Sequence, residues 1–122
     1  MRLSLCWLLL VLAVCSLASD WYISPTGSNA NSGTSDSSPF LDVVTALSVS
    51  VPGDVIYAAA GQYSGAANSN QTLDGVTLTS TACCGETVFV GLTNAPQYTF
   101  LFKLINGAKV TVSTYVYKFA MI

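Results

Sequence analysis

Side chains that could perform acid–base chemistry are scarce in this sequence. It contains six Asp and Glu residues, four Lys and Arg residues and no His. Hydrolysis by carboxylates needs two of them close together, but Asp74 and Glu86 each stand alone beside turn residues. Lys103 and Lys109 alternate with apolar residues, as solvated lysines on the outer face of a strand do. We therefore predict no catalytic residue.

The polar loop 25–38 is the segment that could hold a metal ion. It is rich in Asn and Ser, but Asp36 is its single acid. A Ca²⁺ site draws on several carboxylate oxygens. We interpret the segment as a plain surface loop, and we predict no metal site and no cofactor.

The first 18 residues have the three-part pattern of a secretory signal peptide. Arg2 supplies the positive charge, and Leu5–Val14 is an apolar run. Ser16-Leu17-Ala18 has the small-x-small pattern of a cleavage site. The run is shorter than the roughly 20 residues that span a bilayer, which disfavours an uncleaved anchor. We expect cleavage after Ala18 and a secreted, extracellular protein with no transmembrane segment.

Residues 19–122 then form a single domain or part of one. Six acids outnumber the three lysines of this part, Lys103, Lys109 and Lys118, which gives a formal charge of −3. Nucleic acid is excluded as a partner, because binding it requires clustered cations. Only 8% of the whole chain is charged, so solubility must come from neutral polar groups.

The cysteines are divided between the signal segment and one adjacent pair. Cys6 and Cys15 lie in the signal, which leaves Cys83 and Cys84. Neighbouring α-carbons are about 3.8 Å apart, closer than an ordinary disulfide places them. In an oxidising compartment the pair could form two separate bonds elsewhere, a bond to another chain, or a vicinal disulfide.

Asn70-Gln71-Thr72 satisfies the acceptor rule for N-glycosylation. It follows Asn68 and Ser69 in a polar stretch typical of a surface loop. We therefore predict a glycan on Asn70.

A short helix is predicted after the polar loop. Ser38 offers an N-cap hydroxyl, Pro39 suits the first helical position, and Asp42 lies in the opening turns near the positive end. Pro52-Gly53-Asp54 ends the segment with a turn. One apolar face follows from the spacing of Phe40, Val43, Val44 and Leu47.

The other elements are predicted to be short strands bounded by Gly, Asn, Asp or Pro. They are 21–24, 55–58, 76–79, 87–90, 100–105 and 110–113. No helical stretch of about ten residues separates the strands after residue 55, which argues against alternating strands and helices. A small antiparallel β-sandwich binding module remains an alternative.

One short sequence motif occurs twice in the chain. Asp74–Thr79 and Asn106–Ser113 each start with a turn residue and glycine and continue with alternating Val and Thr. In a coil of strands the turn residues would take positive φ, the valines would point inward and the threonines would lie outside.

An ordered series of motifs runs from Trp21 to Tyr63. It comprises Trp21–Ser28, Asn31–Thr34, Ser38-Pro39-Phe40, Ala46-Leu47, Pro52–Tyr57 and Gly61-Gln62-Tyr63, with a looser continuation at 105–107 and 110–112. The series resembles the N-terminal entry of pectin-lyase-like right-handed parallel β-helix proteins. The resemblance implies an all-β solenoid that starts with a strand, a polar loop and a short N-terminal capping helix.

The resemblance also bears on activity. In these proteins Pro-Gly-Asp begins the first rung, which implies that Asp54 is a turn residue and not a catalytic acid. Lyases of the family use a Lys, Arg or His base with a cation, and hydrolases use Asp residues on adjacent rungs. Residues 19–122 contain no Arg and no His.

The function implied is that of a secreted or cell-surface β-helix protein without a visible catalytic site, acting in adhesion, structure or glycan binding. Extracellular glycans or a cell surface would be its partners. The alternative is the N-terminal fragment of a polysaccharide lyase or glycoside hydrolase that acts on acidic polysaccharide.

A solenoid needs about three or more repeats and a cap at each end. From Val55 the sequence supplies about two rungs and the opening strand of a third, followed by the apolar, β-prone tail 114–122. We expect 19–122 to be the N-terminal part of a longer β-helix domain. A chain that really stopped there would associate end to end.

Overall fold

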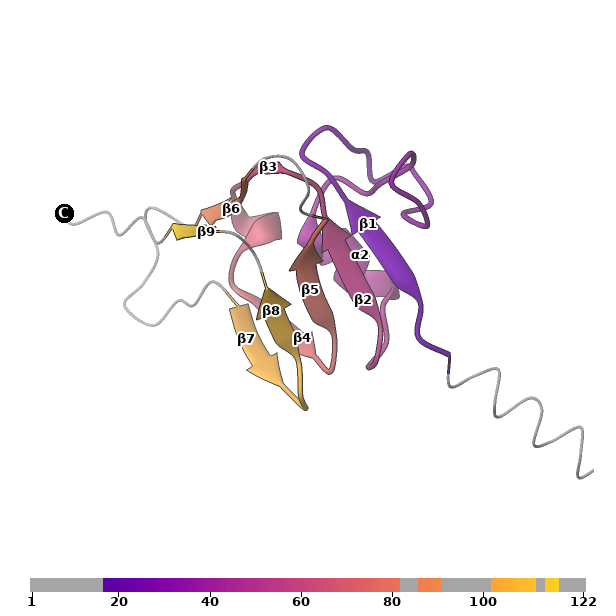
Figure 1. Ribbon diagram of the computed structural model, residues 1–122, viewed down its shortest axis with the longest axis vertical. Helices are drawn as coiled ribbons and strands as arrows, with labels where there is room; N and C mark the ends of the chain where they lie inside the picture. The colour runs from indigo at the N-terminus through magenta and orange to yellow at the C-terminus, as the bar shows by residue number, and fades with distance from the viewer. Residues whose placement is uncertain (1–16, 82–85, 91–101, 112–113, 117–122) are drawn as a thin grey trace, which may run out of the picture.

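The computed structural model describes residues 17–81, 86–90, 102–111 and 114–116 (Figure 1). Nine β-strands, one α-helix and one turn of 3-10 helix lie in these residues. In chain order they are β1 (Asp20–Ile23), α2 (Val43–Val49), β2 (Val55–Ala58), β3 (Gly61–Tyr63), η1 (Ala66–Asn68), β4 (Gln71–Asp74), β5 (Thr77–Ser80), β6 (Thr87–Val90), β7 (Phe102–Ile105), β8 (Lys109–Thr111) and β9 (Thr114–Val116).

The strands form three sheets in which every pair of neighbours is parallel. Sheet A has the order β1-β2-β5-β8, sheet B the order β3-β6-β9, and sheet C the order β4-β7. From β2 the chain visits sheets A, B and C in turn, returns to sheet A at β5, and repeats this path. The described chain is mostly β, as predicted, and the alternative of an antiparallel β-sandwich is wrong.

The core lies inside this coil, where inward side chains of successive turns stack on similar partners. In sheet A, Ile56 pairs with Leu78, and both are fully buried. In sheet B the rings of Tyr63 and Phe89 stack with centroids 4.7 Å apart. Phe102 of sheet C meets Phe89 edge-on at 5.2 Å. Each large buried side chain contributes about 1.5–3 kcal/mol, so these stacks hold the turns together.

Phe40 lies in extended chain and not in the helix where it is predicted. Its N–H donates to the Tyr22 carbonyl at 2.8 Å, and its carbonyl accepts from the Ser24 N–H at 2.9 Å. Phe40 thereby forms a parallel bridge to Ile23. Its ring covers Gly33, which has a φ of 68° and no room for a side chain. The strand-like pairing with β1 overrides the local helix-start signal.

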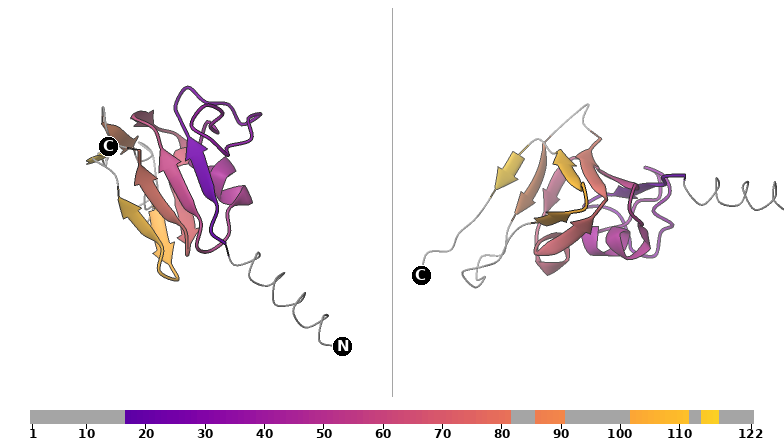
Figure 2. Two further views of the ribbon diagram at one scale, coloured as in Figure 1. Left: turned by 45° about the vertical axis from the view of Figure 1, so that its right-hand side comes forward. Right: turned by 90° about the horizontal axis from the view of Figure 1, so that it is seen from below.

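Helix α2 therefore begins later than the sequence predicts, with Asp42 and not Ser38 as its N-cap. The predicted apolar face is also partly wrong, since the helix buries Val43 and Ala46 while Val44 is 40% exposed. Figures 1 and 2 place α2 at the β1 end of the coil, opposite β7 and β8. It contacts β1, β4 and η1 there.

Successive turns differ in length at their corners. Two residues separate β4 from β5, and three separate β7 from β8. Asp74 therefore pairs with Ile105 in sheet C, whereas Leu78 pairs with Val110 in sheet A. Asn106 is the additional residue, and its backbone takes a left-handed conformation with φ of 53°.

Predicted strands 55–58 and 87–90 coincide with β2 and β6, and 76–79 lies within one residue of β5. Strand β4 is not among the predicted strands, because Gln71 and Thr72 are polar. Predictions that fall on residues 1–16, on Cys83 and Cys84, and on Lys118 lie outside the described residues. In the part of the chain that the structure describes, no helix is long and apolar enough to cross a membrane.

Candidate functional site

The outward side of sheet A aligns side chains from four strands in two rows. Side chains alternate along a strand, and Ile23, Ile56 and Leu78 point into the core, so their neighbours point outward. We call these eight outward residues the sheet A face. One row is Tyr22, Tyr57, Thr79 and Thr111, and the other is Asp20, Val55, Thr77 and Lys109. Figure 1 shows the four strands side by side.

Two tyrosines form the largest feature of the sheet A face. The rings of Tyr22 and Tyr57 stack with centroids 5.3 Å apart and planes 22° from parallel. Both side chains are half-buried, so part of each ring is open to solvent. Tyrosine provides a large, rigid contact area at a small cost in conformational entropy. Thr79 and Thr111 continue the same row with hydroxyl groups.

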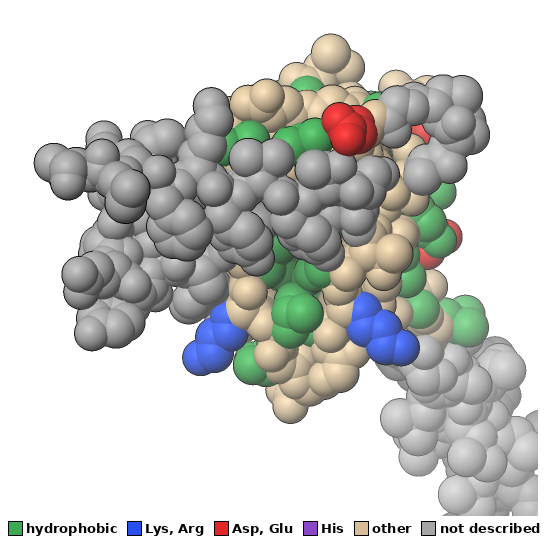
Figure 3. Space-filling view, turned by 60° about the vertical axis from the view of Figure 1, so that its left-hand side comes forward, with side chains coloured by type: hydrophobic (Ala, Val, Ile, Leu, Met, Phe, Trp, Pro, Cys, Tyr) green, Lys and Arg blue, Asp and Glu red, His purple; other side chains and the backbone are tan. Residues whose placement is uncertain are grey.

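The centre of the sheet A face is uncharged. Asp20 and Lys109 occupy opposite ends of their row. Three strand spacings, about 14 Å, separate them, which is too far for an ion pair. Charged side chains are also few and well separated on the face that Figure 3 shows. The charges of the sheet A face therefore lie only at the two ends of one row.

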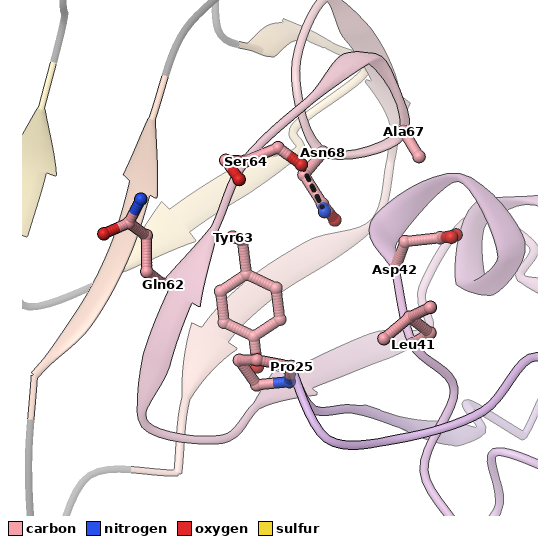
Figure 4. Close-up of a pocket in the computed structure, with 8 residues that line it drawn as sticks. All are labelled: Pro25, Leu41, Asp42, Gln62, Tyr63, Ser64, Ala67 and Asn68. Carbon is pink, nitrogen blue, oxygen red and sulfur yellow. Dashed lines mark hydrogen bonds between the residues drawn. The ribbon is translucent and has the colours of Figure 1, made fainter.

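A second candidate is a hollow of about 320 Å³ beside α2 and β3 (Figure 4). Its walls come from the loop after β1, the start of α2, β3 and η1. The lining residues are Pro25, Leu41, Asp42, Gln62, Tyr63, Ser64, Ala67 and Asn68.

The single carboxylate of the hollow is already engaged. Asp42 accepts from the Asn29 side-chain amide at 2.9 Å and from the N–H and hydroxyl of Thr45 at 3.0 and 2.7 Å. Burial raises the pKa of Asp42, but these hydrogen bonds outweigh burial and lower the pKa below its ordinary value. Asp42 is therefore an ionised helix cap and a poor proton donor.

The other buried polar groups of the hollow are also satisfied. Asn68 accepts from the Val43 N–H at 3.0 Å and donates to the Ser64 carbonyl at 3.1 Å. The Tyr63 hydroxyl donates to the Ala59 carbonyl at 2.8 Å, and burial raises the pKa of Tyr63 far above its usual range. These bonds fix the loops against α2. The polar groups that line the hollow therefore have a structural role.

The ionisable residues weighed in the sequence do not gather in one site. Glu86 precedes β6 in sheet B, and Lys109 lies in sheet A. Asp74 and Lys103 both lie in sheet C, but at different register positions. The Asp74 carboxylate accepts a hydrogen bond of 2.6 Å from Asn106.

Asp54 is more than the turn residue that the resemblance implies. Its side chain is 2% exposed, and its carboxylate accepts hydrogen bonds from Ser19, Trp21 and Val51. It ties the first strand to the turn before β2. Its role in the described structure is to organise the backbone.

Asn70 is exposed, with a φ of 55°, between η1 and β4. The acceptor nitrogen is therefore accessible, and glycosylation stays a prediction. Within the described ranges, no cluster of three or more His, Cys, Asp or Glu residues could hold a metal ion.

Comparison with known proteins identifies one relevant fold. No family model matches the sequence, and no curated protein matches it. A solved structure of a rhamnogalacturonan lyase is similar, with a TM-score of 0.50 and 19% identity. The alignment covers 78% of this chain and 25% of that chain, so the chain spans a quarter of the lyase. At 19% identity the similarity shows a related fold and does not show a shared activity.

Proposed function

We propose that this chain is the N-terminal part of a secreted right-handed parallel β-helix protein that binds a glycan on the sheet A face. The stacked pair Tyr22 and Tyr57, in one row with Thr79 and Thr111, is the observation that carries the proposal. Secretion rests on the signal pattern of residues 1–18.

The repeated path through sheets A, B and C supports the coil. Connections between parallel strands of one sheet are right-handed in nearly all proteins, which supports the handedness. The fold similarity to a rhamnogalacturonan lyase and the motifs from Trp21 to Tyr63 support the family. Capping by α2 at the β1 end agrees with the same assignment.

A sugar ring combines an apolar face of C–H groups with hydroxyls around its rim. The two tyrosine rings offer the matching apolar surface, and the threonine hydroxyls beside them can donate and accept hydrogen bonds. Because the centre of the sheet A face is neutral, the proposal favours a ligand with uncharged sugar rings. Binding to such a ligand should depend little on salt concentration.

The proposal is tested by titrating the secreted protein with a panel of extracellular polysaccharides. We expect Y22A and Y57A each to weaken binding by roughly two- to tenfold. Gln62→Ala is the matched control, because Gln62 is exposed on β3 of another sheet. Circular dichroism establishes that each variant is folded.

Two outcomes would contradict the proposal. One is a folded wild-type protein that binds no polysaccharide in the panel. The other is an equal loss of binding affinity in Q62A and Y57A. That result would mean that the ligand does not bind specifically to the sheet A face.

The second candidate is the entry region of a polysaccharide lyase, which the fold similarity to a rhamnogalacturonan lyase favours. A lyase acting on acidic polysaccharide leaves an unsaturated uronate end that absorbs ultraviolet light. Release of such ends by the protein, together with binding that weakens steeply with salt, would favour this candidate over neutral glycan binding.

A further inference from the structure

The Asp54 carboxylate is a buried charge whose contacts in the described structure all come from neutral groups. Its Oδ1 accepts from the Ser19 N–H at 2.8 Å. Its Oδ2 accepts from the indole N–H of Trp21 and the N–H of Val51, both at 3.0 Å. Buried charges are normally paired with an opposite charge. Within the described residues, three neutral N–H groups stabilise this anion, and one of them is the backbone N–H of Ser19.

Ser19 is the residue at which the chain joins the folded body. Its carbonyl accepts from the Val55 N–H at 3.0 Å, while its own N–H is bound by Asp54. The two residues before it are exposed and lie outside any strand, and Leu17 is 72% exposed. The Ala18–Ser19 peptide bond is thus accessible, and the backbone nitrogen on its C-terminal side is fixed.

We propose that the secreted protein begins at Ser19 and that the amino group released there forms an ion pair with the buried Asp54 carboxylate. Hydrolysis of the Ala18–Ser19 bond by a signal peptidase consumes one water molecule. The carboxyl group stays on Ala18, and the Ser19 nitrogen becomes an amine that takes up a proton at neutral pH. The inference rests on the predicted signal peptide and is independent of any glycan.

The ion pair would strengthen a contact that already exists. A charge-assisted hydrogen bond to a carboxylate is about twice as strong as a neutral one. It would also act on β1, which pairs with β2 alone among the described strands. Asp54 would then hold β1 through a cation at Ser19 and through the indole of Trp21. β1 carries Tyr22, so the processed end would fix one edge of the sheet A face.

The first measurement is the intact mass and N-terminal sequence of the protein secreted from a eukaryotic host. A chain that starts at Ser19 is expected. A start at any other residue overturns the inference, because the amino group would not lie at Asp54.

The second measurement compares melting temperatures. A glycine inserted between Ala18 and Ser19 moves the amino group one residue away and leaves a neutral N–H at Ser19. We expect the insertion to lower Tm by roughly 4 to 8 °C. The same insertion should have almost no effect in a D54N background, and its full effect should persist in D20N, which alters a neighbouring exposed carboxylate. An equal loss of Tm in the wild-type and D54N backgrounds overturns the inference.

A third measurement does not require D54N to fold. The rate of acylation of the α-amino group at neutral pH is compared between the wild-type protein and the insertion variant. Pairing with the Asp54 carboxylate should raise the pKa of the amino group and so slow the reaction in the wild type by roughly tenfold for each pKa unit. Equal rates overturn the inference. Glycan binding enters none of these measurements, so a failure here is distinct from a failure of the proposed function.

Discussion

The side-chain amide of Asn106 donates a hydrogen bond of 2.6 Å to the Asp74 carboxylate, across two successive turns of the chain. Asn106 is the extra residue of its corner, and its left-handed backbone accommodates the added length. The hydrogen bond ties the longer corner to the shorter one below it. Sheets A and C can therefore both continue although their registers differ.

This bond should be measurable as a coupling energy. D74A and N106G each remove one partner, and we expect each to lower the free energy of unfolding by about 0.5–1 kcal/mol. Gly is chosen at position 106 because it tolerates a positive φ. Urea denaturation of the double variant should show less than the sum of the two losses. Strict additivity would mean that the bond contributes nothing in solution.

Leu78 is predicted to be among the residues that stabilise the fold most. It is fully buried in the central part of sheet A, between Ile56 and Val110. We expect L78A to lower the free energy of unfolding by about 2–5 kcal/mol, because it leaves a cavity that neighbours fill only in part. The adjacent Thr79 points outward, so T79A should change stability by less than about 0.5 kcal/mol. Equal effects in urea denaturation would contradict the assigned register.

Substitutions at Gly33 and Gly53 distinguish the energetic cost of backbone strain from that of steric overlap. Both have positive φ, 68° and 97°, but a side chain at Gly33 would overlap the Phe40 ring, whereas nothing lies near Gly53. We expect G53A to cost about 1 kcal/mol from strain alone, and G33A to cost about 1–3 kcal/mol more. The measurement is the midpoint of chemical denaturation. A smaller loss for G33A than for G53A would mean that Phe40 does not cover Gly33.

Asp42 should make stability depend on acid pH. Its pKa is lowered in the folded protein from the ordinary value of 3.8, so the unfolded chain takes up a proton first as pH falls. The contribution is complete above a pH of about 5 and is lost as pH falls through 3.8 and then through the lower folded-state pKa. We expect D42A to cost about 1–2 kcal/mol at pH 7, as for other helix caps, and much less near pH 2.

Asp36 provides the control for this substitution, because it is exposed in the loop before Phe40. D36A should change the free energy of unfolding at pH 7 by less than about 0.5 kcal/mol. A difference between wild type and D42A that stays constant from pH 7 to pH 2 would refute the role assigned to the Asp42 charge.

Local signals in the sequence predict the four strands of sheet A, β6 and β7, because Val, Ile, Leu and aromatic residues there are bounded by Gly, Asn, Asp and Pro. Strands β3 and β9 of sheet B are not among the predicted strands. The same local reading placed the helix start at Ser38. It failed because the partner of Phe40 is Ile23, which no spacing within the helix segment reveals. Strand β4 has only Leu73 as a buried apolar residue, so it carries almost no hydrophobic pattern.

The candidate site shows the same limit. Tyr22 and Tyr57 each lie in a predicted strand, but their stacking depends on the parallel register of β1 and β2. Asp54 likewise reads as a turn residue in a Pro-Gly-Asp sequence. Two of its three hydrogen bonds form only when Ser19 and Trp21 are brought beside it by the fold. Contacts of this kind follow from topology and not from local composition.

The unequal corners of the coil have a consequence for how such a chain can diverge. Two residues join β2 to β3 and six join β5 to β6, yet Tyr63 and Phe89 remain in register. A segment of new length and sequence can therefore be grafted at this corner while the hydrophobic interior keeps its alignment. If relatives exchange whole loops at this corner, the sequence no longer shows a constant repeat length. The common fold would then remain detectable by comparing structures after sequence comparison fails.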